Sequence, residues 1–433
     1  MKNLFLICLV SLLIISCKQT NENVITSDID NFWIAYDSIV STSDGTTQMQ
    51  YLQTLYLDKG TLGLSAIMAA RNYTPEEYLS AINTYPKFWK SIRPNMEKAK
   101  NLGIKINQGI EQLRAIYPDL KPAKVYFTVG VFRTGGTTVD SLVLIGSEVS
   151  MTNNETITEE FPEEMTHLKS HFANNPISDI VFLNVHEFIH TQQKTALEAN
   201  LLTQCLREGV AEFIAEKATK QTSKAPAIIY GNANKNKVKQ QFLKEMFNGY
   251  YRYWLWSNYE NQFNTRDLGY FLGYDMAKHY YNKTENKQAA IKTLIELDYT
   301  NDKTIEEFID KMTYFDKSIA KLKTSYQKNR PMLTNIIEFK NDSKNVDPNI
   351  KQVTIEFSTK MDTRFRGFEL GDLGEQNVMR VENIIGWSND DKAFTFEVNL
   401  EPNKQYQLVL SHGFSSVEGV ELEDYLISFR TGK

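Results

Sequence analysis

Two histidines and a glutamate form the most chemically suggestive group in the sequence. The segment Val185–His190 reads Val-His-Glu-Phe-Ile-His, so His186 and His190 are four residues apart and Glu187 follows the first histidine. On a helix, residues four apart project from one face, and their imidazoles can bind a single metal ion. Glu187 would lie beside that face and could reach water without binding the metal. Two histidines packed in a helical core are the alternative, but the pattern is rare by chance in a chain with 6 histidines.

A catalytic zinc site also needs a third protein ligand and a position left open for water. Glu208 is the candidate: 17 residues separate it from His190, and it belongs to a helical stretch with glutamates at 208, 212 and 216. Alone, such an acidic stripe is typical of a solvated helix surface. After the histidine pair, Glu208 supplies the missing carboxylate, and Glu212 can accept a hydrogen bond from a ligating histidine. We therefore expect one Zn²⁺ per chain, bound by His186, His190 and Glu208.

This arrangement resembles that of the gluzincin metallopeptidases, in which a glutamate downstream of HExxH is the third ligand. The likeness is specific for Val185–Glu216, where Glu208 stands in the sequence Glu-Gly-Val-Ala-Glu. More broadly, bacterial lipoproteins identified as zinc-dependent proteases, near the gliding-motility B lipoprotein group, are similar to this chain at Asn31–Trp33, Val129–Gly146 and Gly269–Tyr274. The resemblance implies a mostly helical, zincin-like enzyme that hydrolyses a peptide or protein substrate.

In such an enzyme Glu187 takes a proton from the attacking water and passes it to the leaving amine. The oxyanion that forms also needs a hydrogen-bond donor. The resemblance implies a tyrosine or histidine from a later helix, and Tyr274 is the first candidate, with Tyr270 and His279 on the same stretch; each can equally be a packed or surface aromatic residue. By analogy, the strand near Val129–Phe132 could pair with an extended peptide.

The N-terminus has the features of a bacterial lipoprotein signal. Residues 1–16 place a lysine before an apolar run from Leu4 to Ile15, which is too short to span a bilayer as a mature helix. The run ends in Ile-Ile-Ser-Cys, which resembles a lipobox, so we expect Cys17 to be lipidated; a signal peptide with a coincidental cysteine is the alternative. Residues 17–27 would then tether an outer-membrane lipoprotein of the cell envelope, either periplasmic or surface-exposed.

Charge and cysteine content exclude other classes of protein. The 48 basic and 53 acidic residues provide no concentrated positive charge for binding phosphates, so we expect no nucleic-acid partner. Because Cys8 leaves with the signal and Cys17 carries lipid, Cys205 is the only thiol of the mature chain and no intramolecular disulfide can form. We expect Cys205 to be a small buried residue of a helix rather than a redox switch.

The pattern of apolar residues predicts an α+β fold. A mostly helical zincin-like metallopeptidase domain with a small β-sheet is expected over residues 28–330. Helical periodicity runs from Asp28 to about Leu120, the residues of Ala123–Met151 predict two or three strands with a glycine turn, and Ile177–Gln193 predicts the helix that carries the histidines. One helix start is legible at Thr74, which precedes a proline and two glutamates.

Beyond Pro331 apolar and polar residues alternate, which predicts an all-β sandwich over residues 331–433. This region resembles the bacterial Ig-like domain, most clearly at Phe357–Asp362, and a cell-surface partner for it is one reading of that resemblance. Two alternatives to an enzyme stay open, namely a non-catalytic zinc-binding or structural lipoprotein that retains the fold, and an adhesin. The intact Glu187 favours the enzyme, because zinc binding alone does not require that base.

Overall fold

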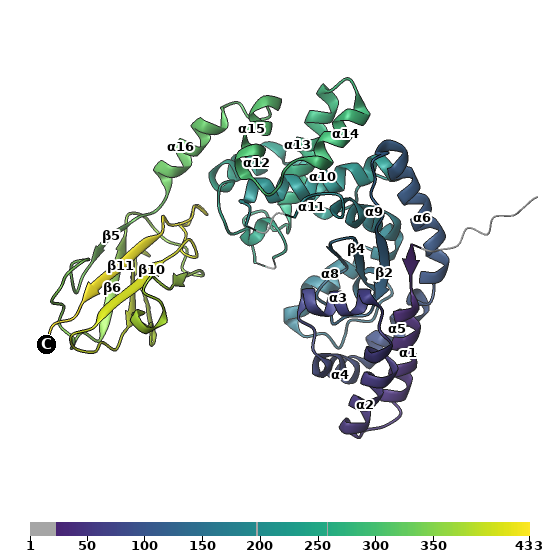
Figure 1. The fold of residues 1–433 in the computed structure, drawn as a ribbon, viewed down its shortest axis with the longest axis horizontal. Coiled ribbons are helices and arrows are strands. Elements are labelled where there is room, and N and C mark those ends of the chain that lie inside the picture. Colours follow the sequence, from purple (N-terminus) through teal and green to yellow (C-terminus); the bar gives the residue numbers. More distant parts are fainter. Residues whose placement is uncertain (1–22, 196–197, 258) are drawn as a thin grey trace, which may run out of the picture. The chain divides into compact units, whose positions relative to one another are not determined.

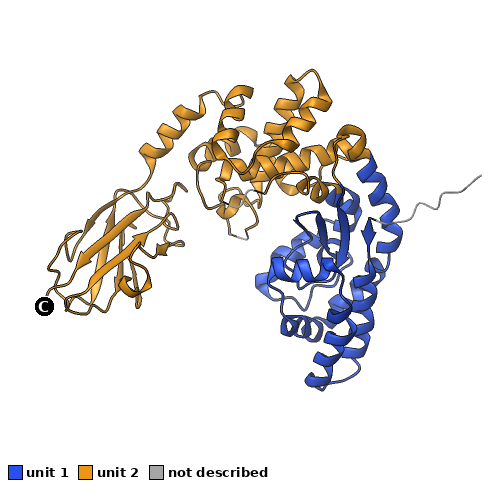
Figure 2. Cartoon of the chain, viewed as in Figure 1, with its two compact units in different colours: residues 1–111, 122–184 blue, residues 112–121, 185–433 orange. Residues whose placement is uncertain are grey.

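The computed structural model describes residues 23–195, 198–257 and 259–433. The signal segment 1–16 and the lipidation candidate Cys17 lie outside these residues, and the tether 17–27 lies only partly within them. The chain forms two compact units, the first built from residues up to 111 together with 122–184, and the second from 112–121 together with 185–433 (Figures 1 and 2). Helices dominate up to residue 330 and antiparallel sheets follow, which confirms the α+β class. Within the described residues, no helix is long and apolar enough to cross a bilayer.

The first unit contains a four-stranded sheet of order β1-β2-β4-β3. Strands β1, β2 and β4 are parallel, and β3 pairs antiparallel with β4 at the edge. The elements of this unit are β1 (Val24–Ile25), α1 (Ser27–Ile39), α2 (Gly45–Leu55), α3 (Leu62–Arg71), α4 (Pro75–Thr84), α5 (Pro86–Met96), most of α6 (Ala99–Ile116), β2 (Lys124–Thr128), β3 (Gly136–Val139), β4 (Leu142–Gly146), α7 (Ser147–Ser150), α8 (Thr166–Ala173) and the first half of α9 (Ile180–His190).

The predicted cap of α4 is present. The Thr74 hydroxyl accepts a hydrogen bond from the backbone N–H of Glu77 at 3.4 Å, and the Glu77 carboxylate accepts one from the backbone N–H of Thr74 at 3.0 Å. This reciprocal pair satisfies two backbone donors at the start of the helix. Aromatic residues fill the core nearby: the ring of Phe32 lies 5.4 Å from that of Tyr56 and 5.0 Å from that of Trp89.

The sequence predicted two or three strands here, and three are present as β2, β3 and β4, but the tight turn is not at the glycines. The chain reverses between β3 and β4 at Asp140, whose φ is +50°. Aspartate tolerates this left-handed conformation because its short side chain can bond to nearby backbone. Gly136 instead begins strand β3.

Residues Val129–Phe132 are not a strand, and their backbone is already bonded within the unit. The Tyr56 hydroxyl donates to the Val129 carbonyl at 2.6 Å and accepts from the Val129 N–H at 3.0 Å. The backbone N–H groups of Gly130 and Phe132 donate to the Glu148 carboxylate at 2.9 and 3.1 Å. Burial raises the pKa of Glu148 to about 7. The segment therefore has few free backbone groups with which to pair with a peptide, contrary to our expectation.

In the second unit, α10 (Leu201–Thr219) and α13 (Leu268–Lys283) cross so closely that their two backbones touch. A Cβ atom on Gly273 would lie 1.7 Å from the Cys205 carbonyl oxygen, and one on Gly209 would lie 2.0 Å from the backbone nitrogen of Tyr274. Cys205 itself is fully buried, as expected, and burial raises the pKa of its thiol well above the usual value. The helices are α10 (Leu201–Thr219), α11 (Pro226–Ala233), α12 (Lys235–Glu245), α13 (Leu268–Lys283), α14 (Lys287–Glu296), α15 (Asp302–Met312) and α16 (Ile319–Asn329).

Two antiparallel sheets make up the C-terminal region, as the sequence predicted. One has the order β11-β10-β7 and the other β5-β6-β9-β8, and side chains of both, among them Phe394 and Ile427, share one apolar core. Buried and partly buried positions alternate strictly along β10, which is the pattern of a strand with one face on a core. The strands are β5 (Leu333–Ile336), β6 (Gln352–Phe357), β7 (Phe368–Glu369), β8 (Ile384–Trp387), β9 (Ala393–Glu397), β10 (Gln405–Leu410) and β11 (Tyr425–Arg430).

This sandwich belongs to the same compact unit as the helices that precede it. The Glu421 carboxylate accepts hydrogen bonds from the backbone N–H groups of Gly249 and Tyr250 at 2.8 and 2.7 Å. The Asn248 side chain donates to the Gly419 carbonyl at 2.8 Å. The predicted boundary at residue 330 follows the end of α16, but the boundary between compact units falls inside α9, so the domain limits stay a prediction.

We expect Gly419→Ala to destabilise the protein strongly. Gly419 has φ +86°, and a Cβ there would lie 2.7 Å from an oxygen of Glu245, a fully buried carboxyl whose pKa burial raises to about 7. The left-handed backbone should cost about 1 kcal/mol and the overlap a further 1–3 kcal/mol or so in free energy of unfolding, measured by chemical denaturation. Gly374→Ala is the matched control, because Gly374 has φ +70° with no atom within 4 Å of its Cβ position. Equal losses in the two variants would contradict a tight contact at Gly419.

Candidate metal centre

Helices α9 and α10 carry the predicted metal ligands. Helix α9 has apolar residues at most positions and ends at His190, three residues earlier than predicted. Helix α10 begins after Asn200, whose side chain accepts a hydrogen bond from the backbone N–H of Thr203 at 3.0 Å. This cap satisfies a free donor at the helix start. The sequence placed Glu208 in this helix correctly.

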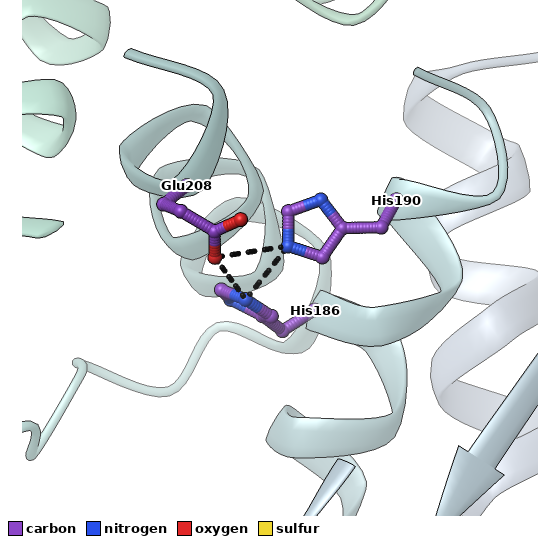
Figure 3. Close-up of side chains that lie close together, drawn as sticks. All are labelled: His186, His190 and Glu208. Atoms are coloured by element: carbon purple, nitrogen blue, oxygen red, sulfur yellow. Dashed lines mark hydrogen bonds and ion pairs between the residues drawn. The ribbon is translucent and has the colours of Figure 1, made fainter. Parts of the chain in front are cut away.

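The side chains of His186, His190 and Glu208 point toward one another (Figure 3). The Nε2 atoms of the two histidines are 3.2 Å apart. Oε2 of Glu208 lies 3.2 Å from Nε2 of His190 and 3.7 Å from Nε2 of His186. All three residues are buried, with 3–7% of their surface exposed. The structure therefore brings together the three residues that the sequence predicted as ligands.

A hydrogen bond behind His190 and a carboxylate behind His186 favour Nε2 as the nitrogen of each ring that faces the cluster. Nδ1 of His190 lies 2.7 Å from the amide oxygen of Gln193, which can only accept, so Nδ1 carries the proton. Nδ1 of His186 lies 2.9 Å from Oε2 of Glu212, close enough for an ion pair although the oxygen is out of line with the N–H bond. Both Nε2 atoms then present lone pairs toward Glu208.

This donor set fits a metal cation. Two imidazole lone pairs and a carboxylate oxygen lie within 3.7 Å of one another, and acceptors at such distances need a cation or a shared proton between them. Ligands 2.0–2.1 Å from a tetrahedral ion are about 3.3 Å apart, close to the three distances in the structure. Burial alone would lower the pKa of His186, but Glu208 and Glu212 outweigh it and raise that pKa to about 10. A bound cation would take the place of that proton.

The carboxylate of Glu208 is held so that one oxygen faces the histidines. Its other oxygen, Oε1, accepts a hydrogen bond from the Arg207 guanidinium at 3.0 Å. Burial opposes ionisation, but the histidines and Arg207 more than compensate and hold the pKa of Glu208 well below its usual range. A carboxylate that is ionised before a metal arrives is suited to be a ligand.

Further residues behind the ligands orient them, and the sequence showed only one of these. Glu212 was predicted, and the Ser223 hydroxyl donates to its second oxygen. Gln193, which the sequence analysis missed, joins His190 to the Arg207 carbonyl through its amide nitrogen at 3.1 Å. Gln193 could have been predicted as a partner of His190, because it stands three residues later, just beyond the end of the helix. No local pattern in the sequence indicated Ser223.

Glu187 is positioned differently from the ligands. It is 8% exposed and forms no hydrogen bond or ion pair with another described residue. Burial raises its pKa above the usual value, partly opposed by the two histidines. A carboxylate with free oxygens and a raised pKa beside a metal ligand is suited to exchange protons with water.

The three candidate oxyanion donors of helix α13 lie in different surroundings. The Tyr270 ring stacks on His186 with centroids 6.1 Å apart, and burial together with the negative charge of Glu208 raises the pKa of its hydroxyl well above the usual value. The Tyr274 hydroxyl donates to both oxygens of Glu216 at 3.0 Å, and Nε2 of His279 lies 3.0 Å from the Met312 carbonyl. We call His186, His190 and Glu208 the metal-binding cluster, after the role we propose for them. Of the three donors, only Tyr270 contacts this cluster, so the geometry favours it over our first choice, Tyr274.

Comparisons with known proteins add little to this geometry. No protein family model matches the chain, and no curated protein matches it. A crystal structure of the S-layer protein rSbsC is 15% identical over 66% of this chain, with a TM-score of 0.18. The matched region spans 44% of that structure. At this score the likeness carries no argument about fold or function.

We predict that three glutamates spaced along α10 differ in their effect on metal affinity. Glu208→Ala removes a charged ligand and should abolish stable Zn²⁺ binding. Glu212→Gln should weaken binding by roughly 10- to 100-fold, as loss of an orienting partner does. Glu216→Gln is the control, because Glu216 bonds to Tyr274 and not to a ligand.

Competition with a chromophoric chelator at one pH would measure all three variants. The ligand assignment is reversed if Glu212→Gln loses zinc while Glu208→Ala keeps it. If neither change matters, the third ligand lies elsewhere.

Proposed function

We propose that the protein is a zinc metallopeptidase that hydrolyses peptide bonds with Glu187 as general base. The observation that carries the proposal is the convergence of His186, His190 and Glu208 with an unengaged carboxylate, Glu187, next to the first histidine. Imidazole nitrogens with one carboxylate oxygen are a ligand set suited to zinc. A site for structure alone would not require a free base beside the ligands.

In this proposal each residue of the chain has one task. Bound zinc supplies a Lewis acid that polarises the scissile carbonyl and makes water more acidic. Glu187 removes a proton from the attacking water and returns it to the leaving amine, and its raised pKa helps the second transfer. Gln193 and Glu212 keep the two imidazoles oriented. Tyr270 is the donor we assign to the developing oxyanion, because its ring stacks on the ligand His186 and its raised pKa keeps the hydroxyl protonated.

The cellular setting is a second part of the proposal and rests on the sequence alone. Residues 1–16 with Cys17 support a lipid-anchored protein of the bacterial cell envelope, with the membrane as partner through the lipid. The substrate is then a peptide or protein outside the cytoplasm. The C-terminal sandwich would be available to a partner at the cell surface.

The central test is Glu187→Gln. This change removes the base but no metal ligand, so zinc content should stay at one per chain while hydrolysis of a peptide library falls by a factor of about 100 or more. Zinc content by elemental analysis and cleavage by mass spectrometry would measure both, with the chelated wild type as the inactive reference. Normal turnover by the variant, or wild-type protein that binds no zinc, would exclude this mechanism.

The anchor is tested separately by Cys17→Ala. Without the thiol no diacylglycerol can be attached, so the protein should leave the membrane fraction as precursor or soluble form. Metabolic labelling with a fatty acid and fractionation would follow this, with Cys205→Ala as a control that leaves the anchor intact. Lipid labelling that persists in Cys17→Ala would disprove the assignment.

A further inference from the structure

One tryptophan next to the metal-binding cluster is exposed. Trp256 has 51% of its surface in solvent, whereas Trp33, Trp89 and Trp254 are at most 4% exposed. Burial of an aromatic ring is among the larger favourable contributions to folding. A half-exposed indole contributes less to the fold, and exposed tryptophans are frequent anchors of binding sites.

Two contacts connect Trp256 to a metal ligand. Its indole N–H donates a hydrogen bond to the Tyr270 hydroxyl at 3.0 Å, and the Tyr270 ring stacks on His186. On its other side, the Tyr251 ring meets the indole edge-on with centroids 5.5 Å apart. We call Tyr251, Trp256 and Tyr270 the aromatic wall. Tyr270 lies at the end of the wall that contacts His186, and Trp256 is exposed to solvent.

The indole is held in a strained backbone conformation. Trp256 has φ +56°, a region that bulky residues rarely adopt and that persists where neighbouring groups impose it. Its backbone N–H donates to the Asp267 carboxylate at 2.6 Å. The next residue, Ser257, is held as well, because its carbonyl accepts a hydrogen bond from the Arg266 guanidinium at 2.8 Å. The indole is therefore oriented before any ligand binds, which reduces the entropy lost on binding.

The polar groups of the aromatic wall are engaged with protein partners. The Trp256 indole N–H is bonded to Tyr270, and the Tyr251 hydroxyl donates to the Ala199 carbonyl at 2.7 Å. Two charged residues that bond to the backbone of Trp256 and Ser257, Asp267 and Arg266, pair with each other at 3.6 Å. What the wall offers a ligand is the apolar face of the indole. A carboxylate placed there would lose hydration without gaining a partner.

We propose that Trp256 is a specificity-determining residue, whose exposed indole face binds an apolar side chain of the peptide substrate next to the cleaved bond. The inference rests on the proposed peptidase function and extends it by naming the class of side chain. Because Tyr270 contacts both Trp256 and His186, a peptide whose carbonyl lies at the metal has a side chain within reach of the indole. Peptides with leucine or phenylalanine at that position would be preferred over peptides with glycine or aspartate.

The test uses two peptide hydroxamates that differ in one side chain, leucine against glycine, and zinc-loaded protein. The wild type should bind the leucine probe about 10-fold or more tightly than the glycine probe, which is the effect of burying one aliphatic side chain. Binding should also change the tryptophan fluorescence, since Trp256 is the most exposed of these tryptophans. In Trp256→Gly, which tolerates the positive φ, the leucine preference should fall to about 2-fold or less, with the glycine probe unaffected.

Two further variants control for structure. Trp256→Phe keeps an aromatic face and should retain most of the preference. Tyr259→Ala removes a ring that is 55% exposed but packs against Phe365, and it should leave both affinities unchanged.

The outcomes separate the two proposals. A leucine preference that survives in Trp256→Gly, or that is lost equally in Trp256→Phe, overturns the role of the indole face but leaves the peptidase proposal standing. If neither probe binds wild-type protein that holds zinc, both proposals fail.

Discussion

The contact between the backbones of α10 and α13 holds Tyr270 close to Glu208 and His186. Gly209 and Gly273 leave no room for a Cβ atom between the helices. Glu208 adjoins the first glycine and Tyr274 adjoins the second, while Tyr270 lies one turn earlier on α13. A wider spacing would move Tyr270 away from both Glu208 and His186. The position of Tyr270 beside the metal-binding cluster is thus a consequence of this close helix packing.

Local patterns in the sequence were sufficient to predict much of this arrangement. The spacing of His186 and His190 places them on one face of a helix. The capping residues at Thr74 correctly predicted the start of α4, and the alternation of apolar and polar residues correctly predicted strand β10. These features depend on neighbours along the chain. Glu208 could be chosen as the proposed third ligand because the two histidines alone leave a zinc site one protein ligand short.

Features that depend on distant residues could not be predicted in the same way. The hydroxyl of Tyr274, our first candidate for the oxyanion donor, bonds to Glu216 on another helix. This contact directs it away from the metal-binding cluster. The apolar sequence around Val129 suggested a strand with free backbone groups. In the structure the Val129 backbone bonds to the side chain of Tyr56, far earlier in the chain. No pattern in the sequence indicated a role for Trp256, because its exposure and positive φ are properties of the folded loop.

The contacts of the sandwich with the segment that precedes α13 have a consequence for the integrity of the chain. Glu421 binds the backbone at Gly249, and the buried Arg252 donates to the Gly413 carbonyl while its guanidinium lies 4.1 Å from the Phe365 ring. These interactions do not depend on the covalent connection between α16 and the sandwich. A single proteolytic nick near Arg330 would therefore leave the two fragments associated. Gel electrophoresis under denaturing conditions would show two fragments, whereas the native particle would keep its mass.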